Sequence, residues 1–451
     1  MNAVILGNGA SGKAAAELLR REGWFVSVLD GTDSWPEGVW NLCVASPGVS
    51  SDHPWQETAR KKGVRIVSEL QLGAERYRAL GGRMLAVTGS KGKSSVVKLV
   101  ADALGGAPCG NYGKPLCEVV LDFMGTGPNF MGTGPCCAVG IGKLPVAVVE
   151  VSSFQMETTE LPPDTFEAAA ILNLQEDHLD RHGSIEAYHA LKRHLLDFAS
   201  VKIVGTDPSK TVAEVEENYK KGLKSELFSG SYFDNPVLRG NGECAVALMR
   251  AAGLGDEAIK AAFARFNALP HRMQVVGVFD AVTYIDDSKA TSLAALIAGV
   301  KMAISRFSQK ISNVFPISKG SVPTIEGPVP TEFQGPVPTE FQGSVPRVRL
   351  IAGGLPKGDD PTVVRECLAD GVARVYLIGQ CAQDFAAAWK AVVPCEVCGT
   401  MEVAVENARR DSKKGDCVLL SPGTASFDQF KSYAERGDRF AVLASCGTST
   451  R

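Results

Sequence analysis

Residues 84–95 read MLAVTGSKGKSS, and this stretch decides the fold of the central part of the chain. Leu85–Thr88 predicts a buried strand, and the apolar residues that follow Ser95 fall on one side of a predicted helix. In a glycine-rich loop between them, backbone N–H groups can surround a phosphate, and the helix N-terminus favours its negative charge. We therefore expect Lys93 at the outer phosphates of ATP or GTP and the Ser94 hydroxyl on Mg²⁺.

This loop departs from a strict Walker A motif, which has glycine where the chain has Val87. An ordinary glycine turn between a strand and a helix is the alternative interpretation, but the lysine and serines favour nucleotide binding. The predicted ATP-binding loop consists of Gly89, Ser90, Lys91, Gly92, Lys93, Ser94 and Ser95.

Length and composition predict a globular protein of two to four α/β domains. The chain has 451 residues, 45% of them hydrophobic, and a net charge of −3, which gives no reason to expect a nucleic-acid or membrane partner. We predict a cytoplasmic monomer, because no apolar run reaches the length of a membrane span and the cysteines are scattered, as in a reducing compartment. Cys395 and Cys398 form a lone CxxC, which we interpret as structural.

The N-terminal residues predict a Rossmann-like domain. A strand at Asn2–Leu6 leads into GNGASG (7–12), a helix, and a second strand that ends at Asp30. Taken alone this pattern predicts NAD binding, but any phosphate-bearing ligand can use such a helix terminus. We place this domain at 1–82, with a hinge at Gly81-Gly82, a central ATP-binding domain at 83–269 and a C-terminal domain at 270–451.

Two further strands of the central domain end in residues that can carry chemistry. Glu150 ends the apolar run VAVVE, which favours a metal-binding role over a solvent-facing carboxylate. His178 and His182 are spaced i,i+4; zinc is conceivable, but the HExxH order is missing, and a solvated polar loop is the alternative. We expect His178 near the metal and the γ-phosphate. Lys192 lies beside an apolar stripe, where a lysine usually extends to solvent.

Two segments are repetitive. Residues 123–135 contain MGTGP twice, and residues 304–347 contain PVPTEFQG twice in tandem. Dense proline forbids helix, so we expect 304–347 to break the pattern of regular structure as a surface insertion. A proline-rich binding arm is the alternative.

In all three predicted domains, strands end in loops typical of ligand binding, which favours the ATP-driven joining of two molecules. Eight motifs occur in order: TGSKGKSS (88–95), GNYGKPL (110–116), VEVSSFQME (149–157), ILNLQEDHLDRH (171–182), LPHRMQ (269–274), IDDSKATS (285–292), GGLPKG (353–358) and LLSPGTASFDQFKSYAERGDRF (419–440). With them the chain resembles the Mur ligases of peptidoglycan synthesis over nearly its whole length. The DSKAT and SPxxASxDQF motifs are similar to those of members that add D-glutamate.

This resemblance implies an ADP-forming amide ligase. ATP would phosphorylate the alanine carboxylate of UDP-MurNAc-L-Ala, and the amine of D-glutamate would attack the acyl phosphate through a tetrahedral intermediate. Mg²⁺ is the implied cofactor, and Lys192 matches the family's carbamylated lysine. The implied metal ligands are Ser94, Glu150, His178 and Lys192.

The resemblance also implies roles for other residues. The catalytic set is Lys93, Asn111, His178, Lys192 and Lys289. Beyond the loop, ATP would meet Arg272 and Asp287. The UDP substrate would meet Gly9, Ala10, Ser11, Gly12, Asp30, Ser46, Asn111, Ser152 and Gln155. D-Glutamate would meet Lys289, Thr291, Lys357, Ser426 and Tyr433.

Two departures from the family pattern stand out. Segment 240–246, GNGECAV, lacks the His-Asn and later Asn that meet adenine, and Tyr433 has a hydroxyl where an aromatic residue without one is usual. Three alternatives explain less. An NAD-dependent oxidoreductase leaves the phosphate loop unexplained, a non-catalytic nucleotide switch leaves DSKAT and SPGTASFDQF unexplained, and a folylpolyglutamate synthase-like ligase is disfavoured by GxGxxG in the first domain.

Overall fold

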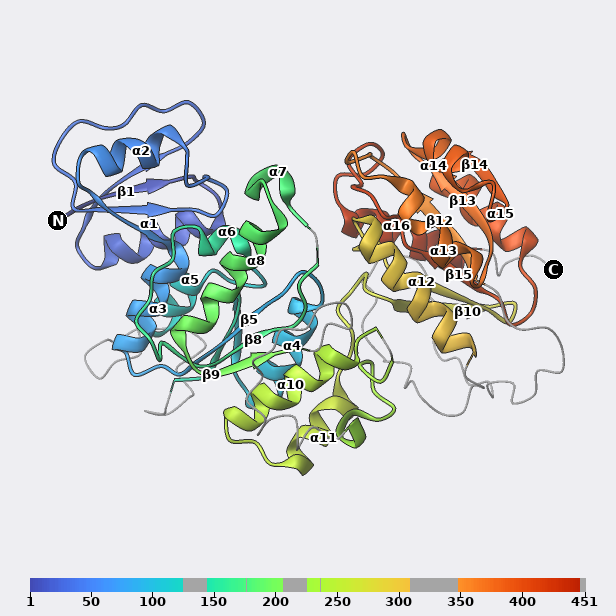
Figure 1. Ribbon diagram of the computed structural model, residues 1–451, viewed down its shortest axis with the longest axis horizontal. Coiled ribbons are helices and arrows are strands. Elements are labelled where there is room, and N and C mark those ends of the chain that lie inside the picture. Colours follow the sequence, from blue (N-terminus) through green and yellow to red (C-terminus); the bar gives the residue numbers. More distant parts are fainter. Residues whose placement is uncertain (125–143, 176, 206–224, 236, 309–347, 447–451) are drawn as a thin grey trace. The chain divides into compact units, whose positions relative to one another are not determined.

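The computed structural model describes residues 1–124, 144–175, 177–205, 225–235, 237–308 and 348–446 (Figure 1). Most of both repetitive segments lies outside these residues. Contacts divide the chain into two compact units. Unit 1 comprises Met1–Ser229 and Leu238–Phe266, and unit 2 comprises Gly230–Val237 and Asn267–Arg451.

The first sheet of unit 1 is parallel, with strand order β2-β1-β3-β4. Its strands are β1 (Asn2–Leu6), β2 (Phe25–Leu29), β3 (Leu42–Ala45) and β4 (Arg65–Ser68). The accompanying helices are α1 (Ala10–Arg21), α2 (Pro54–Lys61) and α3 (Glu69–Ala79). The predicted strand–helix–strand start of a Rossmann-like domain is therefore confirmed.

The second sheet of unit 1 is also parallel, in the order β6-β7-β5-β8-β9. Its strands are β5 (Met84–Thr88), β6 (Ala107–Gly110), β7 (Ala147–Glu150), β8 (Phe166–Ile171) and β9 (Ala199–Val204). Its helices are α4 (Lys93–Leu104), α5 (Leu116–Met124), α6 (Ser153–Met156), α7 (Leu179–His182), α8 (Ile185–His194), α10 (Arg239–Ala251) and α11 (Asp256–Arg265), with 3₁₀ turns η1 (Leu195–Phe198) and η2 (Ser225–Phe228). Because β5 lies between β7 and β8, the loops after these three strands share one sheet edge.

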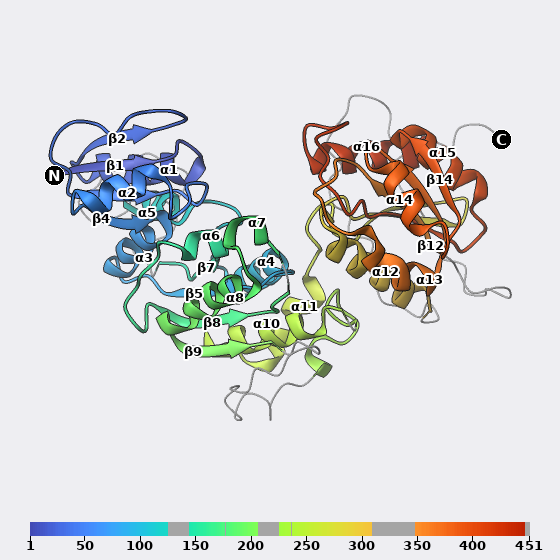
Figure 2. The ribbon, with the colours of Figure 1, turned by 45° about the horizontal axis from the view of Figure 1, so that its top comes forward.

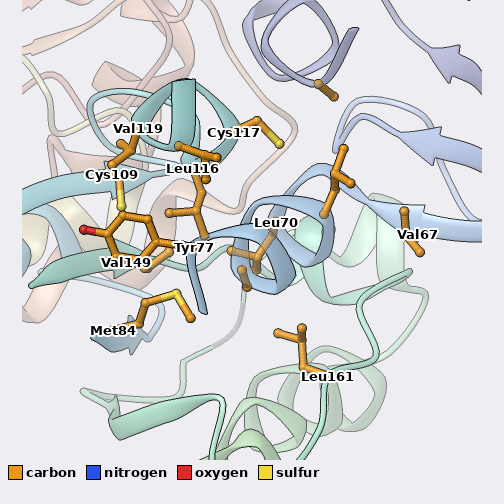
Figure 3. Close-up of a cluster of buried hydrophobic side chains, with 14 of the residues drawn as sticks. Val67, Leu70, Tyr77, Met84, Cys109, Leu116, Cys117, Val119, Val149 and Leu161 are labelled. Atoms are coloured by element: carbon orange, nitrogen blue, oxygen red, sulfur yellow. The ribbon is translucent and has the colours of Figure 1, made fainter. Parts of the chain in front are cut away.

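One hydrophobic core continues from the first sheet into the second (Figure 3). Helix α3 packs on α5, and the fully buried Tyr77 donates its hydroxyl to the carbonyl of Pro145 at 2.5 Å. A Cβ added at Gly82 would lie 2.4 Å from the Tyr77 ring, so a side chain there would disturb this packing. The division at residue 82 and the hinge stay predictions.

Unit 2 contains a sheet in the order β10-β11-β15-β12-β13-β14, parallel except for the β10–β11 hairpin. Its strands are β10 (Gln274–Phe279), β11 (Val282–Asp286), β12 (Val348–Gly353), β13 (Val372–Ile378), β14 (Cys395–Gly399) and β15 (Cys417–Leu420). Its helices are α12 (Leu293–Ser308), α13 (Arg365–Ala369), α14 (Ala382–Trp389), α15 (Met401–Asp411) and α16 (Tyr433–Ser445), with the 3₁₀ turn η3 (Pro361–Val364). Separate hydrophobic cores cover the two faces of the sheet, which makes it doubly wound (Figure 2).

Helix α12 corrects one expectation. We expected regular structure to break from residue 304, but the helix continues to Ser308. The first proline of that segment is Pro316, so no proline interrupts the helix before Ser308. Ala303, the residue just before this stretch, is fully buried in the core of unit 2.

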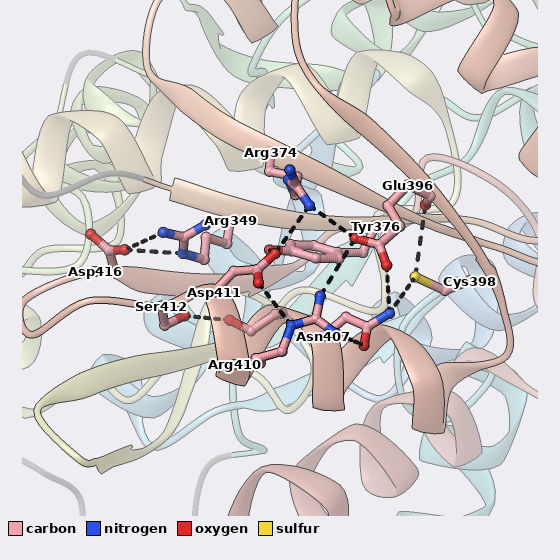
Figure 4. A network of polar contacts seen from close by, with 11 residues as sticks. Arg349, Arg374, Tyr376, Glu396, Cys398, Asn407, Arg410, Asp411, Ser412 and Asp416 are labelled. Carbon is pink, nitrogen blue, oxygen red and sulfur yellow. Dashed lines mark hydrogen bonds and ion pairs between the residues drawn. The ribbon is translucent and has the colours of Figure 1, made fainter.

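The CxxC motif lies on β14, where side chains alternate between the two faces of the sheet. Cys395 packs against one core of unit 2 and Cys398 against the other, which agrees with a structural interpretation. Glu396, between them, belongs to a polar network with Arg374 and Asp411 (Figure 4).

Candidate functional site

The loop after β5 folds as a phosphate-binding loop does. Gly89 and Gly92 have φ angles of 151° and 84°, which only glycine adopts readily, and Gly92 caps the N-terminus of α4. Lys93 is the first residue of that helix, and its Nζ donates to the carbonyls of Gly89 at 2.7 Å and Ser90 at 3.2 Å. The lysine therefore lies back over the loop, where β- and γ-phosphates would bind.

Asn173, just after β8, brackets the backbone of this loop. Its Oδ1 accepts from the N–H of Lys91 at 2.8 Å, and its Nδ2 donates to the Lys91 carbonyl at 3.0 Å. The same Nδ2 donates to Oδ1 of Asn241 at 3.3 Å, and the Asn173 carbonyl accepts from the N–H of Ser90. Neither asparagine was predicted to have a role, although Asn173 stands inside the ILNLQEDHLDRH motif.

Asn241 belongs to the altered segment 240–246. It is buried at the start of α10, and a Cβ added at Gly92 would lie 2.1 Å from its Nδ2. This segment therefore packs directly on the phosphate loop. The sequence signal that could have found it is the single asparagine in GNGECAV.

Lys192 is buried beside the same loop and does not extend to solvent. Its side chain is carried by α8, the residue is 1% exposed, and its Nζ donates to the Gly89 carbonyl at 3.1 Å. It also lies over the Tyr188 ring, 4.7 Å from the centroid. Burial and then the nearby charge of Lys93 lower the pKa of Lys192 from 10.5 to about 6, so its amine is largely neutral at pH 7.

Glu150, at the end of β7, combines burial with an unused oxygen. Its Oε1 accepts from Nδ2 of Asn111 at 2.8 Å, whereas its buried Oε2 has no partner among the described residues. A buried carboxylate oxygen without a partner is costly unless a cation meets it. Together with the hydroxyl of Ser94, the second residue of α4, this carboxylate offers the hard oxygen donors that Mg²⁺ prefers.

His178 is the N-cap residue of the short helix α7 and His182 is its last residue, where a solvated polar loop was the alternative interpretation. Both rings contact the Phe154 ring, at centroid distances of 5.0 and 5.4 Å, and both approach Tyr188. Burial, the largest cause, lowers the pKa of His178 below its ordinary value. Among the residues that the structure describes, no three His, Cys, Asp or Glu side chains gather as a metal centre, so the zinc alternative gains no support.

In the first sheet, the loop after β1 packs tightly at Gly12 and leaves open space at Gly9. A Cβ at Gly12 would lie 1.9 Å from the Gly7 carbonyl, whereas a Cβ at Gly9 would meet nothing within 4 Å. Ser46, after β3, donates to that same carbonyl at 3.3 Å, and Asp30 accepts from the N–H of Gly31. The predicted UDP-contacting residues Gly9, Ala10, Ser11, Gly12 and Ser46 therefore surround the N-terminus of α1.

Ser152 and Gln155 form a capping box at the start of α6. The Ser152 hydroxyl accepts from the backbone N–H of Gln155, and Oε1 of Gln155 accepts from the backbone N–H of Ser152. Next to them, Glu157 accepts two hydrogen bonds from Arg181 and one from the N–H of Ser51. These bonds tie the loop after β3 to the second sheet, a link that our sequence analysis did not predict.

In unit 2, Asp287 is held at the end of β11. Its Oδ2 accepts from the hydroxyl of Ser421 at 3.0 Å, and its Oδ1 accepts from the N–H of Met273. Burial raises the pKa of Asp287 to about 7, while the hydrogen bonds and the charge of Arg272 act in the opposite direction. The predicted pair Arg272 and Asp287 thus belongs to one electrostatic neighbourhood.

The predicted D-glutamate residues come from separate loops of unit 2. Lys289 lies over the Tyr433 ring, with its Nζ 3.9 Å from the centroid. Thr291 is half-buried two residues further on, Ser426 is buried in the loop after β15, and Lys357 is exposed in the loop after β12. The structure thus brings Lys289 and Tyr433 together. The loops of Lys289, Lys357 and Ser426 follow the carboxyl ends of β11, β12 and β15, and Tyr433 is the first residue of α16.

A phosphate loop, a buried lysine beside it and a second doubly wound unit define the architecture of a Mur-type ligase. Residues 87–229 match the Mur ligase middle domain. A UDP-N-acetylmuramoylalanine–D-glutamate ligase of Aquifex aeolicus is 30% identical, with 98% of both chains covered. One of Sphingopyxis alaskensis is 31% identical, covering 97% of this chain and 95% of the relative. The chain belongs to the UDP-N-acetylmuramoylalanine–D-glutamate ligase family, so the resemblance to the Mur ligases is confirmed.

Solved structures agree on the fold. The Thermotoga maritima UDP-N-acetylmuramate-alanine ligase has a TM-score of 0.52 at 15% identity and covers 98% of both chains. The MurF ligase of Thermotoga maritima in complex with ADP has a TM-score of 0.52 at 13% identity, over 90% of this chain and 94% of that one. In the described part of this chain, no helix has the length and apolar character to cross a membrane.

Proposed function

We propose that this protein is an ATP-dependent ligase that joins D-glutamate to UDP-MurNAc-L-alanine and releases ADP and phosphate. The observation that carries the proposal is that two lysine side chains donate hydrogen bonds to the same carbonyl group. Both Lys93 and the buried Lys192 donate to the Gly89 carbonyl of the phosphate loop. The cationic Lys93 at this point suits a triphosphate, and the similarity to D-glutamate ligases over the whole chain supports the substrate assignment.

The chain's own residues position and neutralise the reactants. Transfer of the γ-phosphoryl group to the alanine carboxylate needs alignment and charge stabilisation more than covalent help. The loop N–H groups and Lys93 hold the phosphates, and Asn173 keeps the loop in shape. The amine of D-glutamate then attacks the acyl phosphate. A C–N bond forms, the carbon–oxygen bond to phosphate breaks, and the amine gives up a proton.

Mg²⁺ suits the oxygen donors of Ser94 and Glu150. When bound, it would neutralise charge on the transferring phosphoryl group. Lys192 joins this set as a carbamate: its neutral amine adds to the carbon of CO₂, an N–C bond forms as one C=O π bond breaks and leaves its electron pair on oxygen, and the nitrogen loses a proton. The product is an anionic oxygen donor in place of a neutral amine. His178, which like Lys192 approaches the Tyr188 ring, is the proposed further ligand.

The two other ligands are assigned to opposite ends of the sequence. UDP is proposed at the N-terminus of α1, in the domain 1–82, where glycines leave the helix end open to an anion. D-Glutamate is proposed at the loops of Lys289, Thr291, Lys357, Ser426 and Tyr433, in the domain 270–451. Cations and hydroxyls are the groups that a dicarboxylate requires.

Phosphate release tests the proposal. Purified protein receives Mg-ATP and UDP-MurNAc-L-Ala, with D-glutamate, with L-glutamate or with neither. Release that requires D-glutamate is expected, and L-glutamate should not replace it. Release with another nucleotide but not with ATP would trace to segment 240–246, and no release with any nucleotide would refute the ligase reaction.

A further inference from the structure

Arg436 is a fully buried arginine in unit 2, with none of its surface exposed. It lies one turn after the start of α16, and its guanidinium reaches two loops that are distant in sequence. Nε and Nη2 donate to the Ser288 hydroxyl at 2.9 Å and to the Ser288 carbonyl at 2.8 Å. The remaining donors meet the carbonyls of Thr424 at 3.3 Å and Ala425 at 3.2 Å.

All five guanidinium N–H groups are used in this way, since an arginine side chain has five donors. Arg436 therefore has none left for a substrate, and it acts on the site through the loops. Its acceptors are neutral carbonyl and hydroxyl oxygens, and within the described residues no carboxylate forms an ion pair with it. Burial lowers the pKa of Arg436 to about 10, which leaves the side chain charged at pH 7.

The loops that Arg436 joins carry the proposed D-glutamate residues. Ser288 immediately precedes Lys289, and its hydroxyl donates to the carbonyl of Tyr433 at 2.7 Å. Ala425 immediately precedes Ser426, and its carbonyl also accepts from the N–H of Leu355, which connects the loop of Lys357.

A substituent at Gly354 would disturb the same junction. A Cβ built there would lie 2.4 Å from the Ala425 carbonyl and 3.3 Å from Nη1 of Arg436. Three loops from widely separated parts of the sequence thus pack around one guanidinium. A cation of this kind is expensive to bury, and the neighbouring charges that offset the cost are Asp428 and Asp286.

We infer that Arg436 is a positioning residue of the D-glutamate site, which fixes the loops at 288–291 and 424–426 and adds positive potential beneath a dicarboxylate. The inference deepens the proposed function and rests on it. The planar fork sets the distance between the two loops, and a single ammonium group could not reproduce five bonds in that geometry.

The test compares Arg436→Gln and Arg436→Lys in the full-length enzyme. The matched control is Arg439→Gln, on the same helix, where the arginine is half-exposed and pairs with Glu402. We expect Arg436→Gln to raise the KM for D-glutamate at least tenfold, with the KM for UDP-MurNAc-L-Ala within threefold of wild type. Arg436→Lys should restore part of the loss, because it keeps the charge without the fork. The control should match wild type.

A merely structural role would give a different pattern. A lower unfolding midpoint with unchanged KM values, or a parallel rise in the KM of every substrate, would overturn the inference. If Arg436→Gln does not fold, Ser288→Ala removes one acceptor of Arg436 together with the hydroxyl that donates to the Tyr433 carbonyl, and it should still raise the KM for D-glutamate severalfold. An unchanged KM would also overturn the inference. Wild-type enzyme without D-glutamate-dependent phosphate release would refute the proposed function itself, which separates the two failures.

Discussion

Replacement of Lys192 by methionine should stabilise the protein while it abolishes turnover. The folded-state pKa of Lys192 is about 6 against an ordinary value of 10.5, so the folded protein must give up a proton that the unfolded chain keeps. At about 1.4 kcal/mol per pH unit, this costs about 5 kcal/mol at pH 7 and about 2 kcal/mol at pH 9. The lost hydrogen bond to Gly89 offsets about 1 kcal/mol of the gain.

The sign of the pH dependence follows from the direction of the shift. Between pH 6 and pH 10.5 the unfolded state binds more protons than the folded state, so wild-type stability rises with pH through the Lys192 term. Methionine does not titrate. The stability difference between Lys192→Met and wild type should therefore shrink by about 3 kcal/mol from pH 7 to pH 9.

Urea unfolding in CO₂-free buffer measures this difference at the two pH values. Lys202→Met is the control, because this lysine on β9 is half-exposed and its replacement should leave the difference flat. A Lys192→Met variant that is less stable than wild type at both pH values would refute the reasoning, since it would mean that Lys192 is charged and well paired. A difference that does not shrink with pH would refute it equally.

Three further predictions concern the phosphate loop and a buried ion pair of unit 2. Lys93→Ala should abolish phosphate release without a change in unfolding midpoint, and near-normal activity would contradict the phosphate assignment. Asn173→Ala removes two hydrogen bonds to the Lys91 backbone, each about 1 kcal/mol, so the KM for ATP should rise about tenfold or more in steady-state kinetics; an unchanged KM would contradict it. Asp416→Ala leaves the buried Arg349 without its 3.0 Å partner and should cost about 3–5 kcal/mol in urea unfolding, and a cost below about 1 kcal/mol would argue against a buried pair.

The sequence predicted those strands whose own residues mark them. β1, β5 and β7 are apolar runs that end in distinctive loops, and each lies where we expected it within a few residues. β6 and β14 were missed, because APCG and CEVCG contain proline, glycine or polar residues that give no strand signal. Their strand conformation comes from pairing with β7 and β13, and context of this kind routinely overrides local propensity.

Lys192 shows where a local rule and a motif disagree. A lysine beside an apolar stripe predicts a side chain that extends to solvent, whereas the resemblance implied a buried metal ligand. In the structure the whole residue is buried, so the side chain does not extend to solvent: the carbonyl of Gly89 and the ring of Tyr188 cover the amine. The local pattern could not reveal this, since Gly89 is 103 residues away in the sequence, although Tyr188 lies on the same helix as Lys192.

Asn173 and Arg436 were missed for a different reason. Each holds a loop through backbone N–H or carbonyl groups, which every residue has, so nothing about the residue types in the partner loop reveals the contact. Motifs mark residues that touch a ligand, because ligand chemistry restricts side-chain type. The residues that hold those loops are restricted by distance and by donor count alone. Such positioning residues can be recognised only once the fold has brought their loops together.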